Sequence, residues 1–367
     1  MKIAQIAPLY ESVPPKLYGG TERIVHYLTE ELVKKGHEVT LFASGDSTSS
    51  ARLISNVNQS LRLDPLCVDS LAHHIVQLQE VIERLQEFDI MHFHTDYVHF
   101  PFTQKLNIPC VTTLHGRLDI PDLQPLYNKF PHQRVIAISG SQKGPLPQAN
   151  WVGTVPHGLP TTLHQPGSGD GGYLAFIGRI SPEKGIDRAI EIAIASKTKL
   201  KIAAKVDKVD VSFYESEIKP SLNHPLVEFI GEINEHQKTD FLGKALALLF
   251  PINWPEPFGL AMIESFSCAT PVIAFRNGSV PEVIDEGKTG FIVNSVPEAV
   301  EAVANIKDIL RAGVRQVFEE RFSASDMADK YLQLFDLTIR SFFEDDDEGL
   351  KSFRNLPSFP ERNKKIN

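Results

Sequence analysis

The stretch ALALLFPINWPEPFGLAMIESFSCATPVIAF, residues 245–275, contains the repeating unit of the fold. Its apolar run at 245–250 predicts a buried strand, the segment 258–268 has helical periodicity, and 271–275 predicts a second strand. Two strands joined by a helix form a parallel crossover, and strands that are apolar on both faces belong to a sheet covered on both sides. The stretch therefore predicts an α/β domain.

The same alternation of strand and helix occurs in two series along the chain. The first series has strand patterns at 2–8, 37–43, 89–94, 109–115 and 134–139, with a helix pattern at 20–36; the second opens near residue 172. Between them, residues 156–172 are rich in Pro, Gly and Ser. We expect two Rossmann-like domains, 1–160 and 161–330, facing each other across a cleft. A helix over 331–345 returning to the first domain and a mobile tail over 346–367 complete the prediction.

Composition excludes several classes of protein. The 367-residue chain has a formal net charge of −9, which disfavours a nucleic-acid surface, and no window has the roughly 18–20 apolar residues of a membrane span. Its three cysteines are widely separated, which suits a reducing compartment. We expect a cytoplasmic protein without a transmembrane segment; peripheral contact with a membrane stays open, because a local basic patch can exist on an acidic protein.

Two carboxylates stand eight positions apart in the opening stretch. Glu256 lies between two prolines and so belongs to a rigid loop, whereas Glu264 lies about five residues into the following helix. The start of a helix offers unpaired N–H groups and a partial positive charge, which together attract phosphate. We interpret the pair as holding sugar hydroxyls at the two ends of a nucleotide sugar. The alternative is an exposed loop glutamate and a helix glutamate paired with a neighbour.

Other polar residues come directly after predicted strands. Arg179 and Lys184 in FIGRISPEKG are suited to phosphate, although a charged loop is common at such a place. The glycines of YGGTE, residues 18–22, permit close approach of a ligand or a positive φ, or simply form a turn. His115 is expected at the edge of the first sheet that faces the cleft.

Several alternative sites are weak or missing. In HFHTDYVH, residues 92–99, alternating histidines predict one exposed and one packed ring more readily than a metal cluster. YGGTE is not the full G-x-G-x-x-G fingerprint, and neither the G-x-S-x-G elbow nor the phosphate-binding G-x-x-x-x-G-K-[ST] loop occurs in the sequence. A nicotinamide dehydrogenase is therefore disfavoured.

Taken together, these motifs resemble the family 4 retaining glycosyltransferases. The resemblance covers residues 1 to about 335 and is carried by YGGTE, HG at 115, SGS at 139, VPHG at 155–158, GRISPEKG, EPFGLAMIE at 256–264 and the run 271–293. It implies the GT-B fold and metal-independent transfer of a hexose, with retention, from a nucleotide-diphosphate sugar to a hydroxyl acceptor. We favour UDP as the nucleotide, with GDP or ADP next, and expect no cofactor.

The resemblance also assigns roles to residues of this sequence. It implies catalytic roles for His115, Arg179, Lys184 and Glu256. It implies donor binding by Gly19, Gly20, Lys205, Glu232, Ile233, Phe258, Gly259, Leu260 and Glu264. One departure is His157 in VPHG, where many members have Asn, so this side chain receives no role.

Two other functions remain open at this stage. A nucleotide-sugar 2-epimerase uses a similar fold but needs acid and base groups that the sequence does not supply outside the two glutamates. A non-catalytic module would bind a nucleotide sugar without transferring it. The acceptor, whether a saccharide, a glycolipid or a small metabolite, has no readable code in the loops of the first domain.

Overall fold

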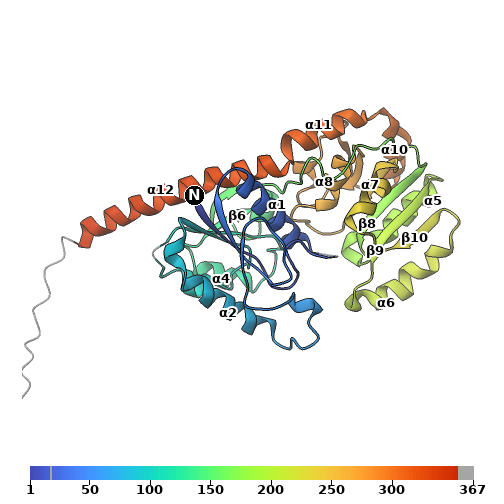
Figure 1. Cartoon of the computed structure of the whole chain (residues 1–367). Helices are drawn as coiled ribbons and strands as arrows, with labels where there is room; N and C mark the ends of the chain where they lie inside the picture. Colours follow the sequence, from blue (N-terminus) through green and yellow to red (C-terminus); the bar gives the residue numbers. More distant parts are fainter. Residues whose placement is uncertain (17–18, 107, 354–367) are drawn as a thin grey trace, which may run out of the picture.

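A computed structural model describes residues 1–16, 19–106 and 108–353 of the chain (Figure 1). Its first sheet has the strand order β3-β2-β1-β4-β5-β6-β7, and its second has the order β10-β9-β8-β11-β12-β13. Every strand pair in both sheets is parallel. The first sheet comprises β1 Lys2–Ile6, β2 Glu38–Phe42, β3 Arg52–Ile54, β4 Ile90–Phe93, β5 Cys110–Thr113, β6 Arg134–Ala137 and β7 Asn150–Thr154. The second comprises β8 Tyr173–Arg179, β9 Lys199–Lys205, β10 Val227–Gly231, β11 Ala247–Phe250, β12 Val272–Phe275 and β13 Gly290–Val293.

Helices cover both sheets, so the predicted architecture of two Rossmann-like α/β domains is confirmed. The first domain contains α1 Gly20–Lys34, α2 Ser70–Ile82, α3 Phe100–Thr103 and α4 Leu123–Lys129. The second contains α5 Ile186–Ala195, α6 Val211–Phe213, α7 Glu235–Gly243, α8 Leu260–Ser267, α9 Val280–Val283, α10 Val296–Asn305 and α11 Arg311–Arg321. No helix in the described ranges combines the length and the apolar character needed to cross a bilayer.

The opening stretch folds as its pattern predicts. β11 and β12 pair in parallel, with Leu248 opposite Val272, and α8 connects them. The side chains of Ile263 and Phe266 on α8 are fully buried. Because this unit places the start of α8 at the carboxyl edge of the sheet, residues 256–264 come to the side of the domain where ligands of such folds bind.

The end of the chain differs from the prediction. The last helix, α12, runs over Ala324–Phe353, so the expected helix over 331–345 is too short and the expected tail is helical as far as 353. At the start of the helix, the Ser323 hydroxyl accepts the Asp326 N–H at 3.2 Å. Residues 324–353 contain no proline, and the acidic run within them does not interrupt the helix. The rest of the predicted tail lies outside the described residues.

Helix α12 joins the two domains. At its start, Leu159 from the end of the first domain bonds to both sides of the helix terminus: the Leu159 N–H donates to the Phe322 carbonyl, and the Ala324 N–H donates to the Leu159 carbonyl. It then lies along α1 of the first domain (Figure 1), and Tyr331 and Phe335 are fully buried there. The helix therefore fixes how the two halves of the cleft face each other.

Candidate functional site

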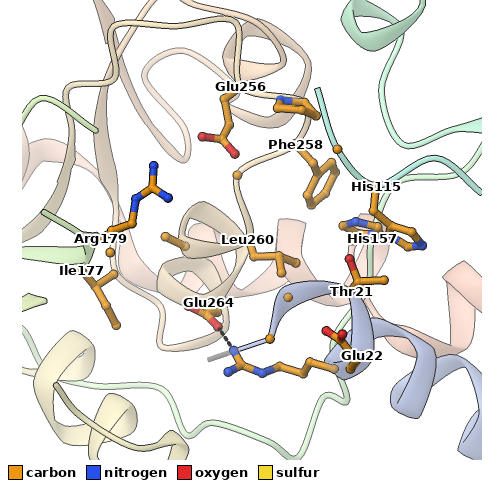
Figure 2. Close-up of a pocket in the computed structure, with 18 of the residues that line it drawn as sticks. Thr21, Glu22, His115, His157, Ile177, Arg179, Glu256, Phe258, Leu260 and Glu264 are labelled. Atoms are coloured by element: carbon orange, nitrogen blue, oxygen red, sulfur yellow. Dashed lines mark hydrogen bonds and ion pairs between the residues drawn. The ribbon is translucent and has the colours of Figure 1, made fainter. Parts of the chain in front are cut away.

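A cavity of about 520 Å³ lies where the two domains face each other. Residues from both domains line it (Figure 2), and they include every residue to which the family resemblance gives a role. These are Gly19, Gly20, His115, Arg179, Lys184, Lys205, Glu232, Ile233, Glu256, Phe258, Gly259, Leu260 and Glu264. The structure brings all of them together, whereas their individual roles stay predictions.

The glycines of the first domain permit close packing. Gly19 has extended backbone with φ 168°, so the positive φ considered for it is wrong. A Cβ added at Gly19 would lie 2.8 Å from the Pro15 Cβ, which excludes a side chain. Gly20 opens α1, and a Cβ there would lie 3.4 Å from the Leu260 Cδ1. The first domain therefore packs closely on the start of α8 at Gly20.

Besides Lys238, three cations line the second-domain side of the cavity, and each contacts a carboxylate. The Arg179 Nε lies 3.2 Å from the Asp210 Oδ2, and the Lys205 Nζ lies 3.0 Å from the Asp207 Oδ1. The Lys184 Nζ lies 2.5 Å from the Glu256 Oε2. Because the cations are positioned before a ligand binds, a phosphate ligand would not have to organise them.

Glu256 is oriented by the rigid loop that contains it. The Trp254 Nε1–H donates to its Oε2 at 3.0 Å, the same oxygen that Lys184 contacts. In Figure 2 the Glu256 carboxylate and the Arg179 side chain point into the same space. A charged donor and a charged acceptor for hydrogen bonds therefore face one ligand-sized volume.

The turn before α8 requires glycine. Gly259 has φ +81°, and an added Cβ would lie 2.9 Å from the ring of Phe250. The first N–H groups of a helix have no partner within the helix, and they carry a partial positive charge. Since Phe258, Gly259 and Leu260 all line the cavity, this helix start adds hydrogen-bond donors to the same region as the cations.

Glu264 belongs to a buried network that spans both domains (Figure 2). Its Oε1 accepts from the Arg23 guanidinium of α1 at 2.8 Å and from the Lys238 Nζ of α7 at 2.6 Å. Glu235 joins the network, with its Oε2 3.2 Å from Arg23 and 3.1 Å from Lys238. Burial raises the pKa of Glu264, but Lys238 and then Arg23 outweigh it and lower the pKa below its ordinary value.

These contacts were missed from the sequence. The considered alternative of a helix glutamate paired with a neighbour describes the contacts of Glu264, while its ribose role stays a prediction. Burial also opposes the charge of Glu235, but its contact with His164 at 3.0 Å and the nearby Lys238 and Arg23 lower its pKa to about 2. A carboxylate deep in an apolar helix signals that cations lie nearby, although it does not say which ones.

Histidines and acidic groups form the first-domain wall. The rings of His115 and His157 stack with centroids 5.2 Å apart and an interplanar angle of 17°. Burial lowers the pKa of His115 to about 3 and that of His157 well below its ordinary value, so both rings are neutral at pH 7. Burial raises the pKa of Asp96, in the same wall, to about 6. His157, left without a role, therefore packs directly on His115.

The strand histidines do not alternate as expected. His92 and His94 are both buried, with 0% and 2% of their surface exposed, so the prediction of one exposed ring is wrong. The two histidines are two positions apart and so point to the same face of the sheet, where their ring centroids lie 4.0 Å apart, and α12 covers that face, with Tyr331 contacting His92. In the described ranges no group of three or more His, Cys, Asp or Glu is arranged to hold a metal ion.

Two family models match the chain, one on each domain. The model described as glycosyl transferases group 1 matches residues 164–325, and the model described as glycosyltransferase family 4 matches residues 18–152. The chain is a glycosyltransferase of the family 4 type.

Known proteins agree with this placement of the glycosyltransferase. A probable sucrose-phosphate synthase of Thermosipho melanesiensis is 37% identical over 95 residues, which are 24% of this chain and 22% of that protein. The chain spans less than half the length of the first curated relatives it matches.

Solved structures share the fold of the glycosyltransferase at low identity. A sucrose-phosphate synthase of Thermosynechococcus elongatus superimposes with a TM-score of 0.76 at 18% identity, covering 93% of this chain and 99% of that one. The Anabaena protein HepE, in complex with UDP and glucose, gives a TM-score of 0.69 at 16% identity, covering 91% and 98%.

Proposed function

We propose that the enzyme transfers a hexose from a nucleotide-diphosphate sugar to an acceptor hydroxyl, with retention at the anomeric carbon and without a metal or cofactor. The observation that carries this proposal is the convergence of Arg179, Lys184 and the start of α8 on one cavity that Glu256 and Glu264 also line. UDP is our preferred nucleotide, and the complex of the structurally similar HepE with UDP and glucose supports that preference.

In this proposal the second domain binds the donor. Arg179 and Lys184 hold the diphosphate, Glu256 accepts hydrogen bonds from the hexose hydroxyls, and Glu264 accepts them from the ribose. The nucleobase of the donor lies near Lys205, Glu232 and Ile233. The Oε1 of Glu264 already accepts two charged hydrogen bonds, so its other oxygen is the one offered to the ribose.

The proposed reaction takes place on one face of the sugar. The bond between the anomeric carbon and the diphosphate oxygen breaks, and its electron pair stays on that oxygen. The acceptor oxygen then bonds to the anomeric carbon on the same face, and its proton passes to the departing diphosphate. Negative charge grows on the diphosphate as the bond lengthens, and the fixed cations and the helix start stabilise it.

A panel of nucleotide sugars tests the proposal. Hexoses linked to UDP, GDP and ADP are mixed with the full chain, and the melting temperature and the release of nucleoside diphosphate are measured. We expect a UDP-hexose to raise the melting temperature, because a ligand that binds the folded state stabilises it. If the folded protein responds to none of the three, the donor assignment is wrong.

The product separates the remaining functions. Proton NMR of the transferred sugar is expected to show the anomeric configuration of the donor. An inverted anomer contradicts retention. An epimerised sugar formed without acceptor identifies a 2-epimerase, and binding without release of diphosphate identifies a non-catalytic module.

A further inference from the structure

A chain of buried hydrogen bonds runs from the cavity wall to α12. The His94 Nδ1 and the His115 Nε2 lie 2.8 Å apart, and the His94 Nε2 lies 2.7 Å from the Gln5 Oε1. On the other side of the amide, the Gln5 Nε2 lies 3.2 Å from the His92 Nδ1. The chain ends with His92 Nε2 to Thr113 Oγ1 at 2.7 Å, and Thr113 Oγ1 to Tyr331 Oη at 3.0 Å.

The amide of Gln5 decides which nitrogen of each ring carries a proton. An amide oxygen accepts, so the His94 Nε2 carries a hydrogen and donates to Gln5. Neutral His94 then has a bare Nδ1, which accepts from the Nε2–H of His115. Neutral His115 is left with a bare Nδ1, which is buried and has no hydrogen-bond partner among the described residues.

The opposite orientation of the chain is less favourable. If the Gln5 amide were turned around, every hydrogen bond would reverse and the His115 Nδ1 would carry the hydrogen. That N–H would be buried without an acceptor, and orphaned buried N–H groups are rarer than under-used acceptors. The orientation of the Gln5 amide and the energetic cost of a buried, unpaired N–H at His115 Nδ1 therefore favour the same direction of hydrogen bonding, in which His115 donates to His94.

We infer that Gln5, acting through His94, fixes His115 as the neutral Nε2–H tautomer, with an unprotonated Nδ1. Gln5 and His94 are positioning residues for His115, and neither of them is a residue to which the family motifs give a role. Burial agrees with this state, because it lowers the pKa values of His94 and His115.

This tautomer matters for the reaction, a step that rests on the proposed function. If His115 lies beside the anomeric carbon, it faces a sugar that becomes positively charged as the bond to the diphosphate breaks. An imidazolium there would repel that charge. The hydrogen bonds that fix the neutral Nε2–H tautomer avoid this repulsion.

Histidine-selective ¹⁵N NMR of the ligand-free chain tests the inference directly. The two ring nitrogens differ in shift according to which one carries the hydrogen, and the His115 signals are those missing from His115→Gln. We expect a protonated Nε2 and a bare Nδ1 at pH 7. A hydrogen on Nδ1, or a charged ring, overturns the inference. The measurement needs no donor, so its failure is separate from failure of the proposed function.

Gln5→Glu gives a second readout with the same side-chain shape. A carboxylate accepts on both oxygens, so we expect the hydrogen of His92 to move to Nδ1 while His115 is unchanged at pH 7. Unchanged His92 would contradict the assigned role of the amide.

The same variant changes the pH profile. His92 faces the ring of His94, and His157 faces the ring of His115. Tyr331 faces His92, and Asp96 and Glu22 line the same cavity. A negative charge beside His94 raises its pKa, and protonated His94 donates to His115 and forces the wrong tautomer. We expect kcat of Gln5→Glu to acquire an acidic limb that the unmodified enzyme lacks, with the donor KM unchanged. Superimposable profiles would contradict the role in catalysis.

His94→Gln removes the partner of His115. We expect kcat to fall on the order of ten-fold, the value of one misplaced hydrogen bond. His99→Gln is the matched control. His99 is also buried in the same domain, but it bonds to Thr103 and Thr112, which do not belong to the chain of hydrogen bonds from His115 to Tyr331. An equal loss in both variants would show a structural effect and overturn the inference.

Discussion

The second-domain wall of the cavity and the part of the first-domain wall around His115 differ in charge. The second-domain wall carries cations, among them Arg179, Lys184 and Lys205, each held by a carboxylate. Arg23 and Arg62 of the first domain also line the cavity, but the neutral wall around His115 presents the rings of His115 and His157, which burial keeps uncharged. Under the proposed function the charged wall receives the leaving diphosphate, and the neutral wall faces the carbon that becomes positive. The contrast teaches that the site must supply positive charge where the diphosphate leaves and withhold it around His115.

The largest expected effect on turnover comes from removing cations of the second-domain wall. Arg179→Ala and Lys184→Ala should each lower turnover by on the order of 10²–10³-fold, because each removes a group that stabilises charge formed in the transition state. Initial rates on the donor found in the panel measure the effect. Lys201→Ala is the control, since Lys201 pairs with Glu228 and does not line the cavity. Near-normal turnover of both cavity variants would remove the phosphate role.

The next effect separates two roles of Glu264. Glu264→Ala should weaken donor binding by about 1.5–3 kcal/mol, the value of a lost charged hydrogen bond, as measured by calorimetry. Arg23→Met removes the contact across the domains and leaves the carboxylate in place. If both variants lose the same donor affinity, Glu264 acts through the domain contact and the ribose assignment is wrong. A loss of donor affinity confined to Glu264→Ala supports the assignment of Glu264 to the ribose.

The sequence predicted residues that depend on short spacing. Glu256, Gly259 and Glu264 lie within one strand-loop-helix unit, so the local pattern alone places them at one sheet edge. Arg179 and Lys184 likewise follow a strand end directly. In these cases the backbone geometry is set by nearby residues, and the chemistry of phosphate and sugar leaves recognisable residue types.

The sequence did not predict contacts that depend on how the domains meet. Arg23 and Glu264 are 241 positions apart, and their contact follows from the approach of α1 to α8. The pattern of alternating His92 and His94 also misled, because the helix that buries one face of β4 comes from the far end of the chain. Strand β3 has three residues, too few for a period of two to be visible.

A smaller effect concerns stability in acid. The pKa of Glu235 is about 2 in the folded protein, below its ordinary 4.5, so its contribution to stability is present above pH 4.5 and is lost as the pH falls toward 2. The contribution is up to ~3 kcal/mol by linkage. We expect Glu235→Gln to melt at a more nearly constant temperature between pH 5 and 3 than the unmodified chain, as followed by circular dichroism. Parallel curves would show that Glu235 is not held in its charged form.

Removal of divalent metal ions is expected to have no effect on the initial rate. This prediction tests whether the cations of the second-domain wall suffice to neutralise the leaving diphosphate. Diphosphate leaving groups are commonly neutralised by a divalent cation bridging their oxygens. Here Arg179, Lys184 and the start of α8 would supply that charge from the protein. We therefore expect unchanged initial rates in excess chelator, with the same enzyme after added Mg²⁺ or Mn²⁺ as the control. Activity that is abolished by chelator and restored by either ion would mean that protein cations do not suffice. The neutral state of His115 and His157 would then have to be explained by the metal and not by the positive charge that develops on the sugar.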